Sequence, residues 1–143
     1  MLLKIRAAGK KDLKTCARIL SEEFNKQGEK WTFKSALAYL TDLFDGGGPC
    51  YCLLLGNKII GFAFCETFVF REGKHLMIEE LAICVDHQDR GYGTKIIKFI
   101  ERLAKKSKIK KIIVITSTTQ RAIKLYKKLG FNETDEKVLE KQI

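Results

Sequence analysis

The spacing of apolar and polar residues changes several times along the chain, and each change predicts a new secondary-structure element. Leu3 to Arg6 alternates in the manner of a β-strand. Helical spacing follows, and Asp12 is a suitable N-cap for a helix that begins near Leu13. A second helix is predicted from about Thr32 to Phe44. The apolar residues that share a helix face are Leu13, Cys16, Ala17 and Leu20 in the first helix, and Phe33, Ala36, Leu37, Leu40 and Phe44 in the second.

The middle of the chain has the pattern of strands. Three glycines and Pro49 end the second helix, and the run from Tyr51 to Leu55 then predicts a strand. Gly56-Asn57 is typical of a two-residue hairpin turn, which leads into a long strand from Lys58 to Phe70. After a further turn, Leu76 to Val85 predicts another apolar strand.

The last third of the chain returns to helical spacing and then alternates again. Apolar residues from Ile96 to Ala104 fall on one helix face, and Ile112 to Ile115 is short enough to be a buried strand. Ser117 or Thr119 is the candidate cap of a last helix that ends at Gly130. The tail, Phe131 to Ile143, has room for a short hairpin. The order β-α-α-β-β-β-α-β-α-β-β predicts a mixed α/β sheet with one parallel crossover between Leu76 and Ile115.

Length and composition predict one ordinary domain over residues 1–143, of which 45% are hydrophobic. The 27 basic and 17 acidic residues give a formal charge of +10. This excess predicts attraction to anions, which include nucleic acid, an acidic membrane and a phosphorylated small molecule. No apolar run is long enough to span a membrane, and the first residues lack the apolar centre of a signal peptide. We therefore expect a cytoplasmic protein without a membrane partner.

The five cysteines lie inside apolar segments, which favours buried, reduced thiols over a disulfide framework. Cys50 and Cys52 share a strand face, but no second pair of ligands follows them and the only histidines are His75 and His87. Structural zinc usually takes four well-spaced ligands, so no metal is expected.

The sequence Gln-Asp-Arg-Gly-Tyr-Gly-Thr at residues 88–94 lies at the predicted junction from strand to helix. Amides in the first turn of a helix are unpaired, and without a Cβ at Gly91 or Gly93 a phosphate can approach them closely. Arg90 or Gln88 could add a donor. The alternative is that the glycines only permit a tight turn. Ile96 stands where a dinucleotide-binding fingerprint needs a third small residue, and a nucleoside triphosphate loop is absent.

A second motif, Ala-x-x-x-Tyr-x-x-x-Gly-Phe, occupies residues 122–131, one strand and one helix after the first. Together the two motifs resemble those of the GNAT (Gcn5-related) superfamily of N-acetyltransferases, and the element order is similar over nearly the whole chain. The resemblance implies a central mixed sheet of about six to seven strands, flanked by about four helices. It also implies transfer of an acetyl group from acetyl-CoA to a primary amine, by direct attack in a ternary complex and without a metal.

The resemblance also assigns the binding residues. The pyrophosphate of coenzyme A would lie on Gln88, Asp89, Arg90, Gly91, Tyr92, Gly93 and Thr94. The pantetheine arm would pair with the backbone of Ile83, Cys84 and Val85, where the strand separates from its neighbour. Tyr126 would lie beside the sulfur, and Thr119 stands where many relatives have an Asn that contacts the cofactor.

The transfer needs a base for the amine and a proton for the departing thiolate. Tyr126 is the candidate proton donor, with core packing as its alternative role. Glu79 and Glu80 are the candidate bases, because acids are unexpected inside a strand. Strict alternation would place them on opposite faces, and Glu79 matches the family's base position better. The alternative is that both are solvated surface acids.

The acceptor remains open between a small molecule and a protein or peptide amine. Acids on and near the first two helices, together with Glu66, could attract a cationic amine, and Trp31 or Phe70 could line its pocket. Two rival functions are coenzyme A binding without transfer, and nucleic-acid binding through the lysines between residues 105 and 111. The second is not expected, because no aromatic platform accompanies these lysines. The family resemblance also makes a homodimer a candidate assembly.

Overall fold

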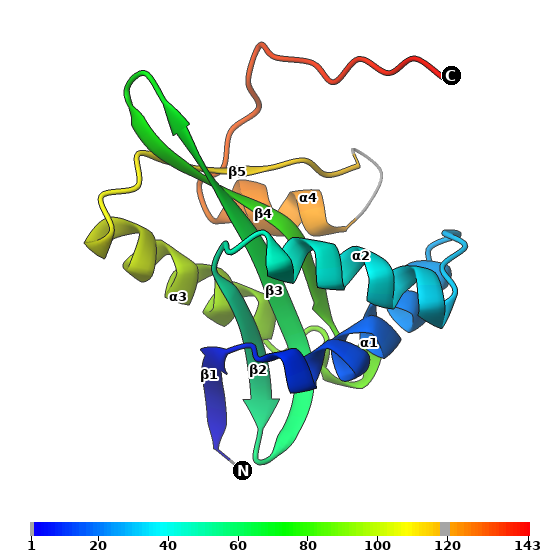
Figure 1. Ribbon diagram of the computed structural model, residues 1–143. Helices are drawn as coiled ribbons and strands as arrows, with labels where there is room; N and C mark the ends of the chain where they lie inside the picture. Colours follow the sequence, from blue (N-terminus) through cyan, green and yellow to red (C-terminus); the bar gives the residue numbers. More distant parts are fainter. Residues whose placement is uncertain (1, 118–120) are drawn as a thin grey trace.

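The computed structural model describes residues 2–117 and 121–143 and has a mixed five-stranded sheet in the order β1-β2-β3-β4-β5 (Figure 1). The strands are β1 (Leu3–Ala7), β2 (Cys50–Leu55), β3 (Lys58–Phe70), β4 (Gly73–Ile83) and β5 (Lys111–Val114). The helices are α1 (Leu13–Asn25), α2 (Phe33–Asp45), α3 (Tyr92–Lys106) and α4 (Ala122–Lys128), with short 3-10 turns at Lys10–Asp12 and Val85–His87. The mixed α/β class and the expected element order as far as α4 are confirmed.

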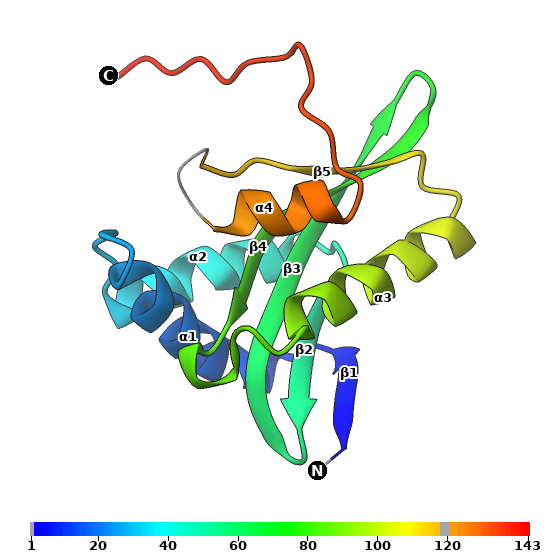
Figure 2. The ribbon, with the colours of Figure 1, turned by 180° about the vertical axis from the view of Figure 1, so that it is seen from behind.

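The two faces of the sheet carry different pairs of helices, as Figures 1 and 2 show from opposite sides. One buried cluster joins α1 and α2 to Cys50, Cys52, Phe62 and Phe64 of the sheet. The other joins α3 and Tyr126 of α4 to residues of β2, β3 and β4, which include Ala63, Cys65, Leu76 and Ile78. Strand residues contribute alternately to the two clusters, which is the pattern of a sheet buried on both faces.

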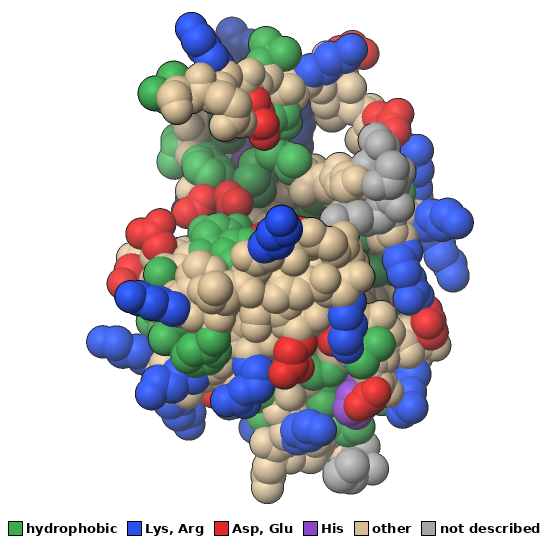
Figure 3. Space-filling view, turned by 90° about the vertical axis from the view of Figure 1, so that its right-hand side faces the viewer, with side chains coloured by type: hydrophobic (Ala, Val, Ile, Leu, Met, Phe, Trp, Pro, Cys, Tyr) green, Lys and Arg blue, Asp and Glu red, His purple; other side chains and the backbone are tan. Residues whose placement is uncertain are grey.

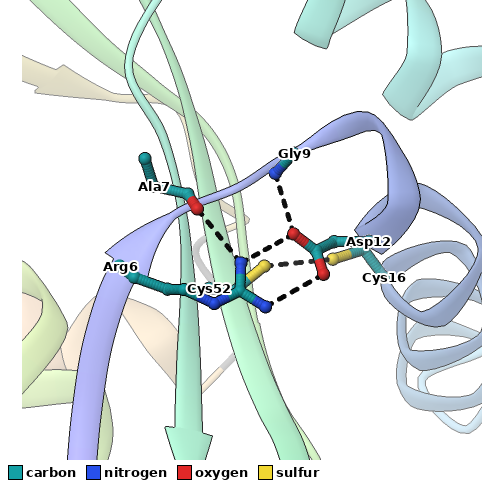
Figure 4. A network of polar contacts seen from close by, with 6 residues as sticks. All are labelled: Arg6, Ala7, Gly9, Asp12, Cys16 and Cys52. Atoms are coloured by element: carbon teal, nitrogen blue, oxygen red, sulfur yellow. Dashed lines mark hydrogen bonds and ion pairs between the residues drawn. The ribbon is translucent and has the colours of Figure 1, made fainter.

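The junction between β1 and α1 is held by a charged network (Figure 4). Asp12 does not cap α1 with its side chain, so that prediction is wrong. Its carboxylate instead accepts hydrogen bonds from both terminal nitrogens of Arg6, at 2.7 and 3.1 Å, and from the Gly9 N–H at 2.8 Å. The Arg6 guanidinium therefore holds the pKa of Asp12 below its usual value, against the opposing effect of burial. Nearby, the sulfurs of Cys16 and Cys52 lie 3.8 Å apart, and both thiols are free.

Strand β4 is antiparallel to β3 along its whole length but pairs with β5 only at its beginning. The parallel ladder with β5 runs from the His75–Lys111 pair to the Ile78–Val114 pair and then stops. Residues 79–83 of β4 therefore lack a neighbouring strand on that side among the described residues. This is the strand separation that the family resemblance implies.

The end of the chain differs from the expectation. Residues 132–143 are extended and exposed, and the described residues there form no hairpin. The sheet has five strands rather than the expected six to seven for this reason. Helix α4 has Arg121 at its N-cap position, which excludes Ser117 as the cap, and Thr119 lies outside the described residues.

Candidate active site

A groove of about 430 Å³ opens at the end of β4, between α1 and α4. The residues that line it come from the end of α1 and the turn after it (Glu23, Phe24, Gln27), β4 (Leu81, Ala82, Ile83), the β4–α3 connection and α3 (His87, Gln88, Asp89, Gly91, Tyr92, Gly93, Thr94), and the beginning and end of α4 (Arg121, Ala122, Leu125, Lys128). The structure thus brings together most of the expected cofactor-binding residues. Cys84, Val85, Arg90 and Tyr126 are not among the lining residues.

Glycine is favoured at the two positions of the loop, Gly91 and Gly93, for different physical reasons. Gly91 has φ +79°, and a Cβ built on it would meet no atom within 4 Å, so its backbone conformation favours glycine while the space beside it is open. At Gly93 a Cβ would come within 3.1 Å of the Leu125 side chain on α4. Gly93 therefore lets α3 and α4 approach each other. The first amides of α3 lie at this wall of the groove, where a helix N-terminus attracts anions.

Glu23 of α1 fixes the loop to the end of β4. Its carboxylate, on a residue with 7% exposure, accepts hydrogen bonds from the Val85 N–H at 2.9 Å and from Gln88 Nε2 at 3.0 Å. The same Gln88 nitrogen donates to the Ile83 carbonyl at 2.8 Å. From the sequence, Glu23 was expected only among the acids on the first two helices that could attract an acceptor. Its position on the apolar face of α1, three residues after Leu20, was the sequence signal that could have predicted its burial.

These contacts also occupy backbone groups at the end of β4 and just after it. The Val85 N–H is bonded to Glu23, the Cys84 N–H donates to the Ile60 carbonyl at 2.8 Å, and the Ile83 carbonyl accepts from Gln88. The three backbone positions that the family resemblance assigns to the pantetheine arm therefore already have partners within the chain. Residues 79–82, nearer the end of the ladder with β5, offer the unpaired edge.

Asp89 is paired with Arg121 at the start of α4, so its charge is compensated inside the groove. Arg121 also lies 3.4 Å from Gln88 Oε1. Arg90 is exposed and does not line the groove. The groove presents Lys128 and the Asp89-paired Arg121 beside the amides of α3, and this surface is suited to an anion.

A β-bulge changes the direction of the two candidate bases. In the ladder between β3 and β4, Phe64 pairs with Glu80 while the next residue, Cys65, pairs with Ile78, so Glu79 is the extra residue. Glu79 is hydrogen-bonded to Glu66 of β3, and Glu80 accepts a hydrogen bond from the Tyr39 hydroxyl of α2 at 2.9 Å. Both carboxyl groups therefore lie on the α2 side, and the expectation of opposite faces is wrong.

Both carboxyl groups have raised pKa values. Burial raises the pKa of Glu80 to about 7, with further contributions from the charges of Glu29 and Glu79, while the Tyr39 hydrogen bond opposes the rise. The pKa of Glu79 is raised to about 7, first by burial and then by the hydrogen bond and charge of Glu66. Two carboxyl groups that change protonation near neutral pH are suited to acid–base work.

Aromatic and acidic side chains of the α1–α2 connection surround this pair. Trp31 stacks on Tyr39 with 5.2 Å between the ring centroids, and its Nε1 donates to Glu29 at 2.9 Å. Figure 3 shows this side of the molecule, which is hollowed, with apolar side chains inside the hollow and acidic side chains beside it. Glu66 was expected among the acids that could attract the acceptor, whereas Tyr39 was not predicted as a site residue, because only the folded chain brings it to Glu80.

Tyr126 lies in the core cluster beneath α3 and is 7% exposed. Its ring packs edge-to-face against Phe131, with 5.3 Å between the centroids, and its hydroxyl forms no hydrogen bond within the described part of the chain. Burial raises the pKa of Tyr126 to about 12, and the charges of Glu80 and Cys65 add to the effect. The residue is therefore a neutral phenol at neutral pH, able to donate a proton.

Residues 2–117 and 121–143 contain no group of three or more His, Cys, Asp or Glu side chains arranged to hold a metal ion. Among the same residues, no helix has the length and apolar character that crossing a membrane requires.

Comparison with known proteins places this geometry in a family. Residues 13–131 match the model of the acetyltransferase (GNAT) family. No curated protein matches the sequence.

Several solved structures share the fold at low sequence identity. A structure described as a possible acetyltransferase from Clostridium difficile 630 is 17% identical, with a TM-score of 0.87 over 100% of this chain and 99% of its own. A predicted acetyltransferase with acetyl-CoA from Clostridium acetobutylicum is 22% identical, with a TM-score of 0.79 over 98% and 96% of the two chains. An aminoglycoside acetyltransferase from an uncultured soil metagenomic sample, in complex with sisomicin, is 18% identical, with a TM-score of 0.74 over 99% and 95%.

Proposed function

Because the chain belongs to the acetyltransferase (GNAT) family, we propose that it transfers the acetyl group of acetyl-CoA to a cationic primary amine by direct attack in a ternary complex. The observation that carries the proposal is the position of the anion-binding groove at one end of the unpaired part of β4, with Glu79 and Glu80 at the other end.

The groove fits the phosphates and the pantetheine arm of acetyl-CoA. The diphosphate would accept hydrogen bonds from the first amides of α3, where Gly91 leaves open space, and would be attracted by Arg121 and Lys128. The arm would run along residues 79–82 of β4, whose edge has no strand neighbour, in the manner of an added strand. This path leads the thioester from the glycine loop toward the two glutamates.

The chemistry then requires the ammonium group to lose two protons, one before the attack and one as the amide forms, and the thiolate to gain one. A protonated alkyl amine has a pKa of about 10, so a base with a pKa near 7 can take the first proton, directly or through water. Glu79 is the proposed base, with Glu80 beside it. The neutral amine nitrogen bonds to the thioester carbon, the carbon–sulfur bond breaks, and Tyr126 donates its proton to the departing thiolate. The second proton, which the nitrogen loses as the amide forms, restores the phenol of Tyr126.

The acceptor class follows from the charge around the base. Although the chain carries a net +10, Glu29, Glu66, Glu79 and Glu80 gather beside the stacked rings of Trp31 and Tyr39. Carboxylates and aromatic faces both attract ammonium groups. A small molecule with several amines fits this surface, and the similarity of fold to an aminoglycoside acetyltransferase in complex with sisomicin supports an amino sugar as a candidate.

Calorimetric titration with acetyl-CoA tests the first half of the proposal. We expect micromolar binding by the wild type, and loss of binding in Gly91→Glu, which places a side chain and a negative charge where the phosphate would lie. Gly47→Glu is the matched control, because Gly47 has φ +81° and open space around it, as Gly91 does with φ +79°, but does not line the groove. Absence of binding by the wild type would refute the proposal, as would equal loss in both variants.

A panel of amines tests the second half. We expect acetylation of polyamines and amino sugars at neutral pH, with a KM that rises at least about tenfold in Glu66→Gln, a change of about 1.4 kcal/mol in binding. Glu22→Gln removes the same charge from an exposed position of α1 and should leave KM unchanged. Turnover of neutral or peptide amines only, with no response to Glu66→Gln, would contradict the cationic acceptor.

A further inference from the structure

A groove of about 310 Å³ lies between β1 and α3, away from the proposed acetyl-transfer site. Figure 2 shows β1 as the outermost strand of the sheet, with α3 beside it. The residues that line this β1–α3 groove are Leu3 and Ile5 of β1 and Lys95, Lys98, Phe99 and Arg102 of α3. None of them lines the groove at the end of β4, so acetyl-CoA bound there would not occupy this surface.

Strand β1 has an unpaired outer edge beside this groove. It pairs with β2 on one side, and no strand lies on its other side among the described residues. The Ala8 N–H donates to the Cys50 carbonyl at 2.8 Å, so the even-numbered residues of this segment form the hydrogen bonds to β2. Because hydrogen-bonded and non-hydrogen-bonded pairs alternate along an antiparallel ladder, the N–H and C=O groups of Leu3 and Ile5 point to the outer edge. An extended peptide could pair with these groups as an added strand.

The apolar side chains of the β1–α3 groove are only half-buried. Leu3 and Ile5 pack at the margin of the core cluster beneath α3 and keep part of their surface exposed. The ring of Phe99, also half-buried, lies edge-to-face against Tyr51 of β2, with 5.1 Å between the centroids. A strand added to β1 would place alternate side chains on this face of the sheet and would cover these apolar groups.

Cations line the same groove and have no carboxylate partner in the chain. Lys95, Lys98 and Arg102 are exposed, and none of them forms an ion pair within the described residues. The Arg102 guanidinium lies 5.9 Å from the centre of the Phe99 ring. Lys4 adds a further exposed cation on the other face of β1. A segment of complementary charge is therefore acidic.

We propose that the β1–α3 groove binds an extended acidic peptide segment of a different protein, which adds as a strand to the outer edge of β1. The backbone of the segment would pair with Leu3 and Ile5, and acidic side chains at alternate positions would face the cations of α3. A second copy of this edge does not fit, because its cations would lie opposite those of the first. A nucleic acid would supply phosphates for the cations but no strand for the edge of β1. This inference does not depend on the proposed acetyl transfer.

Fluorescence polarisation with a labelled peptide tests the proposal on the full chain. The probe is a peptide with blocked ends in which glutamate and valine alternate over about nine residues, and the control peptide has lysine in place of glutamate. We expect saturable binding of the acidic peptide alone, with a dissociation constant that rises at least about tenfold in Lys98→Glu. Lys14→Glu makes the same change of charge at an exposed position of α1 and should leave the dissociation constant unchanged. No binding of the acidic peptide, or equal loss in both variants, would overturn the proposal.

Hydrogen exchange, followed residue by residue by NMR, separates strand addition from attraction of charges alone. When the acidic peptide is bound, the amides of Leu3 and Ile5 should exchange at least about tenfold more slowly. The amides of β5, at the opposite edge of the sheet, should exchange at an unchanged rate. Binding without slower exchange in β1 would contradict strand addition. Displacement of the peptide by duplex DNA or by anionic lipid vesicles that themselves depend on Lys98 would assign the cations to a phosphate surface and would also overturn the proposal.

Discussion

The substitution Glu80→Gln should stabilise the protein at alkaline pH and have a much smaller effect on its stability at pH 5. Burial is the main reason that the pKa of Glu80 rises from 4.5 to about 7. The protonated form is therefore the one that the fold favours, so the contribution of Glu80 to stability is fully present below pH 4.5 and is lost as the pH rises through about 7. At about 1.4 kcal/mol per pKa unit, the loss amounts to about 3 kcal/mol at pH 8.5.

Glutamine cannot ionise, and its carbonyl oxygen can still accept the hydrogen bond that Tyr39 donates to Glu80. Equilibrium urea unfolding, followed by circular dichroism, should show the midpoint of Glu80→Gln about 1 to 2 M above that of the wild type at pH 8.5. At pH 5 the difference should fall to about a quarter of this, because the unfolded carboxyl, with a pKa of 4.5, is already mostly ionised there. Glu22→Gln, on the exposed side of α1, should match the wild type at both pH values. A gain of the same size at pH 5, or no gain at pH 8.5, would refute the assignment of burial as the cause.

Three further predictions concern the reaction and the fold. Tyr126→Phe should lower kcat at least about a hundredfold with little change in the KM for acetyl-CoA, because the hydroxyl would act only on the leaving thiolate; an unchanged kcat would remove Tyr126 from the mechanism. The rate should rise with pH through a midpoint of about 7, as the pKa of Glu79 requires, and Glu79→Gln should abolish that rise in a pH profile of kcat/KM. Asp12→Asn should lower the free energy of unfolding by about 2 kcal/mol at pH 7, since it breaks the ion pair with Arg6. The loss should be much smaller near pH 3. Because folding lowers the pKa of Asp12, its contribution to stability is present above pH 3.8 and disappears as the pH falls through the folded pKa. Thermal unfolding at both pH values measures this difference.

Local patterns were sufficient to predict most of the fold. Thr32, with Ser35 at the third helical position, caps α2, and Gly56-Asn57 forms the turn between β2 and β3, as short-range signals predict. Each of these signals acts within a few residues. The end of the chain was predicted less well, because pairing of a strand depends on a partner that local spacing does not identify. The tail, Phe131 to Ile143, has room for a short hairpin, yet residues 132–143 have no sheet neighbour among the described residues.

The site was predicted in part for the same reason. The glycine loop and Tyr126 belong to compact motifs, so the sequence alone was enough to propose them, and their roles stay predictions. The common direction of Glu79 and Glu80 depends on a bulge in the register between β3 and β4, and strict alternation has no means of revealing a bulge. Glu23 and Tyr39 act on residues 62 and 41 positions away along the chain, at distances of 2.9 Å. Such contacts exist only after α1 and α2 have packed on the sheet.

The arrangement of charge along β4 supports a particular end of the unpaired strand segment for each proposed substrate. Donors of positive potential, which are the first amides of α3, Arg121 and Lys128, lie beyond the C-terminal end of the strand. Carboxyl groups lie at the bulge, one residue after the ladder with β5 ends at Ile78. A polyanionic donor and a cationic acceptor would therefore be attracted to opposite ends of the same unpaired segment. The two substrates would meet along this segment, near the end where Glu79 and Glu80 change protonation near pH 7. If the two substrates exchanged ends, each would lie beside groups of its own charge.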